Sequence, residues 1–271
     1  MNGLLYFFDD HVKPHILKGT KLLKPEETGN LPNGISAIRE GDVNLWLVTK
    51  DGKTIAIDTG HINYPKIATK FKRIGIDPHT IRHVLLTHAD VDHAGGIDAK
   101  AKYNVYPKAD VYLGRNEEKY LKHEMHRMVK AGRKIYNCVT LKDGYRLLED
   151  NEELDLDSFH IKAIEVPGHT MGHMCYIIDN EILFSGDSLA INRDGGYAFW
   201  DFFCQDPDLN RSSLQHLKKE AEKADIKYVC TGHSGFWEAD GNLFAHIDEA
   251  APFGRKVVFD EDADTDVCRR T

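Results

Sequence analysis

Short apolar runs bounded by turn residues predict β-strands in the first third of the chain. Four runs have this character: residues 35–38, 43–48, 54–57 and 83–87. The turn dipeptide Asp51-Gly52 separates the second run from the third, as in a β-hairpin. Between the last two runs, Ile67, Phe71 and Ile74 recur with the spacing i, i+4 and i+7, which predicts a helix. Residues 88–93 are then expected to form a loop that leads into a further helix.

The second half of the chain alternates in the same way. Six apolar runs are predicted to be strands: residues 111–113, 146–148, 161–166, 174–178, 182–184 and 228–230. Three segments are predicted to be helices: residues 116–131 with Asn116 as N-cap, 212–223 and 242–251. Two sheet-rich halves with helices outside predict an α/β fold, an αββα sandwich of two mixed β-sheets flanked by helices.

No repeat, low-complexity segment or Pro- or Ser-rich linker divides the 271 residues, so a single domain over residues 1–271 is expected. Residues 1–34 are expected to be irregular, because proline and glycine interrupt any period. The acidic residues from about 260 to 271 are expected to form a solvated tail. No apolar run is long enough to span a membrane, and no signal peptide is expected.

The charge and cysteine content limit the partners and the compartment. The chain has 35 Lys and Arg against 43 Asp and Glu, a net charge of −8, which argues against nucleic acid or an anionic membrane as the main partner. A small-molecule substrate is expected, and the oligomeric state is left open. The five cysteines form no CxxC pair, so neither a disulfide framework nor a zinc ribbon is predicted. A reducing, cytoplasmic location is the expectation.

Histidine or aspartate follows four of the predicted strands. Seven such residues are enough to hold two metal ions: His88, Asp90, Asp92, His93, His169, Asp187 and His233. Imidazole and carboxylate groups bind Zn, Fe, Mn or Ni, and strand ends in α/β folds are where functional sites usually lie. In an extended segment the side chains of His88 and Asp90 point the same way. Asp92 and His93 lie at the turn into a helix and can face a different ion.

The same residues resemble a known family. Four motifs carry the resemblance: His88-Ala-Asp90-Val-Asp92-His93, Gly168-His169-Thr170, Gly186-Asp187-Ser188 and Gly232-His233. With the upstream Asp58-Thr59-Gly60 they resemble the metallo-β-lactamase fold superfamily, over about residues 35–237. Residues 167–173 look like the version in its glyoxalase II-like and lactonase-like hydrolases. In one departure, Asp90 stands where the family pattern HxHxDH has its second histidine.

The resemblance implies an αββα sandwich with a binuclear metal centre at one edge. It implies two groups of ligands and a bridge: His88, Asp90 and His169 for the first ion, Asp92, His93 and His233 for the second, and Asp187 between them. Asp58 is expected to support the ligands. The expected cofactors are two divalent metal ions, zinc by family. Iron or manganese is the alternative, because Asp90 adds a charge and a hard oxygen donor to the first site.

The leading functional prediction is a metal-dependent hydrolase. Its metal-bound hydroxide would cleave a small ester, lactone or thioester, with Asp92 as the catalytic proton acceptor. One alternative is a diiron redox protein that reduces oxygen or nitric oxide and receives electrons from a separate donor, suggested by Asp90. A second is a non-catalytic metal-binding sensor.

Two segments are candidates for setting the substrate specificity. They are the predicted helix and its continuation, residues 116–134, and the aromatic segment 192–207. Tyr197, Phe199 and Trp200 either line a substrate pocket or pack in the core, and the sequence leaves both alternatives open. His173, four residues after His169, is expected to pack or to support a ligand.

Overall fold

The computed structural model describes residues 25–129, 133–135, 139–142, 144–192 and 194–251. Most of the segment expected to be irregular, residues 1–34, and the acidic segment from about 260 to 271 lie outside these ranges. The described end of the first segment contains β1 (Gly29–Asn30) and a 3-10 turn, η2 (Pro32–Gly34).

The first half of the chain forms a seven-stranded mixed sheet in the order β1-β2-β3-β4-β5-β6-β9. The bounds of its longer strands are β2 Ile35–Glu40, β3 Val43–Lys50, β4 Lys53–Ile57, β5 His83–Leu85, β6 Asp110–Gly114 and β9 Arg146–Leu148. Strands β2 to β4 are antiparallel neighbours. Asp51 and Gly52 take positive φ values of 51° and 73° in the predicted hairpin turn. Strands β4, β5, β6 and β9 pair in parallel, so their carboxyl ends share one edge.

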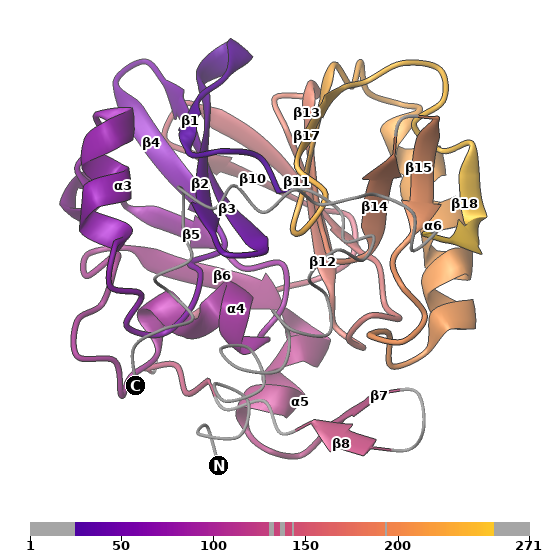
Figure 1. Cartoon of the computed structure of the whole chain (residues 1–271), viewed down its shortest axis with the longest axis horizontal. Helices are drawn as coiled ribbons and strands as arrows, with labels where there is room; N and C mark the ends of the chain where they lie inside the picture. Colours follow the sequence, from indigo (N-terminus) through magenta and orange to yellow (C-terminus); the bar gives the residue numbers. More distant parts are fainter. Residues whose placement is uncertain (1–24, 130–132, 136–138, 143, 193, 252–271) are drawn as a thin grey trace.

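The second half forms a six-stranded sheet in the order β10-β11-β12-β13-β16-β17. The bounds are β10 Glu152–Leu156, β11 Phe159–Glu165, β12 Met174–Ile178, β13 Ile182–Gly186, β16 Tyr228–Thr231 and β17 Phe236–Glu238. Strands β13 and β16 are parallel, while the other pairs are antiparallel. Figure 1 shows this sheet beside the first one, and the two sheets pack face to face through a shared apolar core.

Helices cover the outer faces of the two sheets (Figure 1). Helix α3 (Ile67–Ile74) buries Phe71 against the first sheet, and α6 (Pro207–Ala221) buries Leu214 and Leu217 against the second. Between the sheets, the rings of Trp46 and Phe184 lie 6.5 Å apart, centroid to centroid. The shorter helical pieces are η3 Pro78–Thr80, α4 Val91–Ala94, η4 Gly95–Ile97, η5 Arg115–Glu117 and α5 Glu118–Leu121. The predicted αββα sandwich is confirmed.

Two smaller sheets extend the sandwich. A three-stranded sheet has the order β14-β15-β18, and β7 pairs with β8. Their bounds are β14 Leu189–Asn192, β15 Gly195–Ala198, β18 His246–Ala250, β7 Arg127–Val129 and β8 Arg133–Ile135. The segment 192–207 is therefore partly a strand that belongs to the fold.

The predicted helix over residues 116–131 is wrong beyond Leu121. The chain forms the short pieces η5 and α5 and then the strand β7, and Asn116 lies inside η5 and is not an N-cap. Tyr120 and Leu121 are buried, but the next three residues are exposed and polar, so a longer helix has no apolar face to bury there. His123, with φ of 59°, turns the chain away.

The predicted helix over residues 242–251 is also wrong. Leu243 and Ile247 have helical spacing and both are buried. Leu243, however, lies in a turn and Ile247 lies in strand β18. Strand β18 pairs in parallel with β15, with Tyr197 opposite His246. A pairing partner distant in sequence thus overrides a local period of only two apolar residues.

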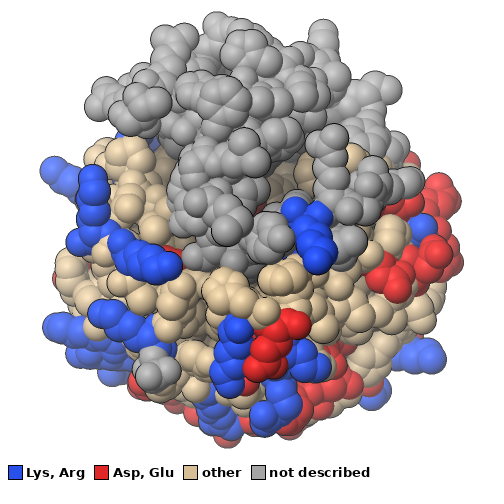
Figure 2. Space-filling view, turned by 90° about the horizontal axis from the view of Figure 1, so that it is seen from below, with Lys and Arg blue, Asp and Glu red and all other residues tan. Residues whose placement is uncertain are grey.

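No helix in the described ranges is long and apolar enough to cross a membrane. On the face drawn in Figure 2, described Lys and Arg side chains lie among Asp and Glu side chains along the lower edge. The expectation that the chain binds neither nucleic acid nor membrane stays a prediction.

Candidate metal centre

The structure brings the seven predicted ligands together where the two sheets meet. Their loops follow β5, β11, β13 and β16, four strands from both sheets. Within this cluster, three sets have ligand atoms that all lie within 4.8 Å of one another: His88, Asp90 and His169; His88, His93 and Asp187; Asp92, His93 and His233. The first and third sets are the two groups that the sequence resemblance implies. Their role as metal ligands stays a prediction.

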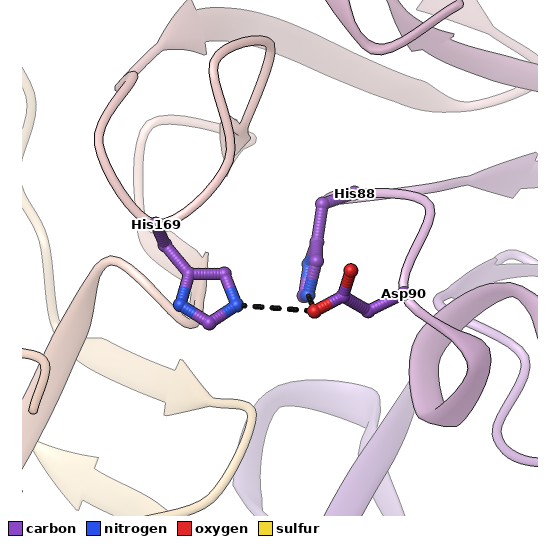
Figure 3. A group of neighbouring side chains, drawn as sticks. All are labelled: His88, Asp90 and His169. Atoms are coloured by element: carbon purple, nitrogen blue, oxygen red, sulfur yellow. Dashed lines mark ion pairs between the residues drawn. The ribbon is translucent and has the colours of Figure 1, made fainter. Parts of the chain in front are cut away.

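The first group joins the end of β5 to the loop after β11 (Figure 3). Oδ2 of Asp90 lies 3.6 Å from Nε2 of His88 and 3.5 Å from Nε2 of His169. Asp90 occupies the N-cap position of α4, where an aspartate normally accepts a hydrogen bond from the helix backbone. It makes no such bond, and its carboxylate faces the two imidazoles instead.

Asp187, in the loop after β13, lies at the middle of the cluster. Its Oδ1 is 3.4 Å from Nε2 of His93. Its Oδ2 is 3.1 Å from Nε2 of His233 and 3.5 Å from Nε2 of His169. Asp92, in the first turn of α4, completes the second group, with Oδ2 3.6 Å from Nε2 of His233. A single buried carboxylate thus faces histidines from three different loops.

Buried groups behind the cluster fix the orientation of its histidines. The Nδ1–H of His93 donates to Oδ2 of Asp58 at 2.7 Å, so Nε2 is the nitrogen that faces the site and that offers an electron pair to a cation once it loses its proton. Asp58 is itself held by the N–H and the hydroxyl of Thr87, each at 2.8 Å. The Nδ1–H of His233 donates to the backbone carbonyl of Asp42 at 2.5 Å. The expected supporting role of Asp58 therefore has a geometric basis.

His173 and Gly232 shape the surroundings of Asp187. Nε2 of the fully buried His173 accepts the backbone N–H of Asp187 at 3.0 Å, which fixes the start of this loop. A Cβ on Gly232 would lie 2.1 Å from Oδ1 of Asp187 and 2.9 Å from Cε1 of His93. Only glycine lets the backbone after β16 approach these two predicted ligands so closely.

The buried charges of the cluster support one another. Burial raises the pKa of Asp187, but the positive charges of His233 and His93 outweigh it and hold that pKa well below its usual value. Burial lowers the pKa of His93, but Asp187 and Asp58 raise it well above its usual value. Such imidazoles exchange a proton for a cation, so metal binding at this cluster would weaken as the pH falls.

The donor set of the second group fits a divalent cation. Nε2 of His93 and Oδ1 of Asp187 are buried and face each other as an ion pair at 3.4 Å, but neither atom makes a hydrogen bond within the described residues. Buried polar atoms are normally satisfied, and a cation is the partner that an imidazole nitrogen and a carboxylate oxygen at this spacing can share. Nε2 of His88 is orphaned in the same way and also faces His93 and Asp187.

Arg127, at the start of β7, is a member of the cluster that the sequence analysis missed. It is 2% exposed, and its Nη2 lies 2.8 Å from Oδ2 of Asp90 and 3.0 Å from Nε2 of His169. Its charge contributes to a pKa of about 3 for His169, where burial is the larger cause. Arg127 lies in the segment predicted to be a polar helix, and no motif singles it out.

Glu117 is a second buried charge that the sequence did not reveal. Its carboxylate accepts the N–H of Ala89 at 2.9 Å and the hydroxyl of Thr170 at 2.8 Å, so it ties together the loops that carry His88 and His169. Burial raises the pKa of Glu117. We infer a positioning role, because Glu117 reaches the cluster through the backbone of its loops.

The aromatic segment after Asp187 divides between site and core. The ring of Phe199 lies 5.1 Å from that of His169 and 5.8 Å from that of His233, centroid to centroid, so Phe199 walls the cluster. Tyr197 stacks on His246 at 4.6 Å. Trp200 packs with Phe199 in a small apolar cluster.

Comparison with known proteins agrees with this geometry. The sequence model of the metallo-beta-lactamase superfamily matches residues 38–233. The probable metallo-hydrolase YqgX of Bacillus subtilis is 32% identical over 148 residues, 54% of this chain and 65% of the relative. The hydroxyacylglutathione hydrolase of Prochlorococcus marinus is 29% identical over 174 residues, 62% of this chain and 57% of the relative. The chain thus matches less than two thirds of the length of these curated relatives.

A solved structure supports the fold. AidC, a dizinc quorum-quenching lactonase in complex with a product, N-hexnoyl-L-homoserine, superposes with a TM-score of 0.54 at 21% identity. The superposition covers 70% of this chain and 72% of AidC.

Proposed function

Because this chain belongs to the metallo-beta-lactamase superfamily, we propose that it is a metal-dependent hydrolase of a small ester, lactone or thioester. The position of Asp187 carries the proposal. Its carboxylate faces the histidines of three loops within 3.5 Å, which a metal centre requires and an ordinary strand-end turn does not. A hydroxyacylglutathione hydrolase and a lactonase among the similar proteins favour the thioester and lactone classes.

The residues divide the work of hydrolysis between them. A divalent ion held by Asp92, His93, His233 and Asp187 would supply Lewis acidity and a water molecule of lowered pKa. Asp92 is the proposed proton acceptor, since its carboxylate is 19% exposed and borders the cluster, where it can take the proton of the attacking water and return it to the leaving group. Asp187, with its lowered pKa, stays ionised at neutral pH. Phe199 places an apolar ring against His169.

Zinc is the proposed metal by family, and iron or manganese is the alternative that Asp90 favours. The second ligand group fits an ion because Nε2 of His93 and the facing Oδ1 of Asp187 are buried and make no hydrogen bond within the described residues. The first group differs, because Arg127 already contacts two of its three ligand atoms. The clustering of seven candidate ligands therefore favours the binuclear centre that the resemblance implies. The contacts of Arg127 with Asp90 and His169 argue against an ion in the first group.

A diiron redox protein with a separate electron donor is the second candidate. One observation favours it: the Asp90 carboxylate stands beside two imidazoles, His88 and His169, and adds a hard donor that iron accepts.

A cytoplasmic location, expected from the sequence, stays part of the proposal.

The test is metal analysis of protein purified without added metal, followed by turnover on esters, lactones, thioesters and phosphodiesters. We expect hydrolysis of at least one ester, lactone or thioester, loss of turnover on chelation and recovery on adding a divalent ion. Asp187→Ala should lower turnover at least 100-fold and reduce the metal content. The control Asp208→Ala removes an exposed carboxylate and should change neither.

Three results would contradict the hydrolase. Turnover that survives complete chelation would remove the metal from the reaction. A metal-loaded chain that hydrolyses none of the substrates would favour the sensor. An iron-loaded chain that consumes oxygen or nitric oxide with an electron donor, without hydrolysis, would favour the redox protein.

A further inference from the structure

Arg127 occupies the ligand atoms of the first group. One nitrogen, Nη2, lies 2.8 Å from Oδ2 of Asp90 and donates to Nε2 of His169 at 3.0 Å. The same oxygen and the same nitrogen are two of the three ligand atoms expected for a first metal ion. A neutral imidazole has one in-plane electron pair at such a nitrogen, so His169 cannot give it to a guanidinium N–H and to a metal at once.

The backbone holds Arg127 in this place. Its other terminal nitrogen, Nη1, donates to the backbone carbonyl of His169 and to that of Phe203, the latter at 2.7 Å. The side chain is 3% exposed. The guanidinium is charged at every pH of interest, and moving it away would separate a buried cation from a carboxylate and two carbonyl groups, which is costly.

The pair Asp90–Arg127 is also balanced in charge. A guanidinium beside a neutral histidine would be an uncompensated buried cation, whereas beside Asp90 it forms a hydrogen-bonded ion pair. The carboxylate at position 90, which departs from the pattern HxHxDH, thus has a partner in the same fold.

Three other ligand atoms of the cluster remain available to a cation. Nε2 of His93, Oδ1 of Asp187 and Nε2 of His88 are buried without a hydrogen-bond partner within the described ranges. They lie beside Asp92 and His233, in the two sets that do not include Asp90 or His169. These atoms can surround one cation.

We propose that the guanidinium of Arg127 replaces the first metal ion, so that the centre binds one divalent ion and not two. The inference rests on the metal centre of the proposed function and deepens it. Asp90 and His169 then serve as partners of Arg127. The single ion is held by His93, Asp187, His233 and Asp92, with His88 beside them.

The test counts ions per chain, independently of activity. The full-length protein is loaded with excess zinc, freed of unbound metal by gel filtration and analysed by native mass spectrometry and elemental analysis. The variants are Arg127→Ala and Arg127→Met, which remove the charge, and Arg127→Lys, which keeps a cation. The matched control is Arg115→Ala, which removes an exposed arginine paired with Glu149. Circular dichroism verifies that each variant is folded.

We expect one zinc ion in the wild type, in Arg127→Lys and in Arg115→Ala, and two in the folded charge-removing variants. Two ions in the wild type would overturn the inference and leave the proposed function intact. No ion in the wild type would overturn both. One ion in folded Arg127→Ala and Arg127→Met would show that Arg127 does not exclude the second ion. If these variants do not fold, calorimetric titration of the wild type with zinc decides, with one site supporting the inference and two overturning it.

Discussion

At the scale of single residues, the candidate centre depends on how closely the backbone approaches the predicted ligands as well as on the type of ligand. Gly232 precedes His233 and faces the carboxylate of Asp187. The ligand types follow from the sequence motifs, because histidine and aspartate at four strand ends are visible in the chain itself. The contact of Arg127 with Asp90 does not follow from the sequence. It depends on how a loop brings β7 back to the site, and no local pattern specifies that loop.

We predict that Gly232→Ala weakens metal binding at least 10-fold while the protein still folds. The new methyl group would overlap Oδ1 of Asp187, at 2.1 Å, and force this ligand to move. A cost of about 1–3 kcal/mol in the free energy of unfolding is expected from such overpacking. The measurement is competition for zinc against a chelator of known affinity.

The matched control for this change is Gly241→Ala. A Cβ at Gly241 would meet no atom within 4 Å, so its zinc affinity and stability should stay within error of the wild type. Equal zinc affinity in the two glycine variants would show that the approach of Gly232 to Asp187 does not matter for the centre.

At the scale of elements, strands with clear apolar runs are predictable even when they are short, as β5 and β9 show, whereas a polar strand such as β10 is not. The sequence does not predict strand β10, because its only apolar residues, Leu154 and Leu156, stand among acidic ones. Both leucines are buried, as expected for alternate positions of a strand. Helix α6 was predicted from 212 but begins at Pro207. Its true start was visible in the chain as Asp206 before Pro207, an N-cap before a proline at the first helical position.

We predict that Asp206→Ala lowers the free energy of unfolding by about 1 kcal/mol. The Asp206 carboxylate accepts the backbone N–H of Leu209 at 2.9 Å, and alanine would leave this donor to solvent instead of the cap. Asp206→Asn keeps an acceptor and should keep most of the stability. The measurement is denaturant unfolding of the three proteins, and an Ala variant as stable as the Asn variant would refute the cap.

At the scale of the whole molecule, a polar contact joins the outer helix α6 to the second sheet. Glu220 on α6 accepts hydrogen bonds from Lys162 on β11 and from Lys223 beyond the helix, each at 2.6 Å. These bonds lower the pKa of Glu220 from 4.5 to about 2. Because its pKa is lower in the folded state, the stability that Glu220 contributes is present above pH 4.5 and is lost as the pH falls from 4.5 towards 2.

We therefore predict that Glu220→Gln destabilises the protein by about 1 kcal/mol at pH 7. The difference from the wild type should shrink as the pH falls below 4.5. The measurement is thermal unfolding over a pH series. The control Glu222→Gln changes an exposed residue two positions on and should leave the curve unchanged. A deficit in Glu220→Gln that is constant with pH would refute the assignment.

The two-sheet architecture was predictable because alternating strands and helices admit few packings. The proposed number of ions was not, because the proposal rests on a contact between β7 and the loop of Asp90. The central claim, a metal-dependent hydrolase, is tested most directly by titrating metal-free protein with zinc while following hydrolysis of the best ester, lactone or thioester. The account predicts no turnover without metal and a linear rise that saturates when the second ligand group is filled, at one ion per chain. Equal turnover in metal-free and loaded protein would contradict it.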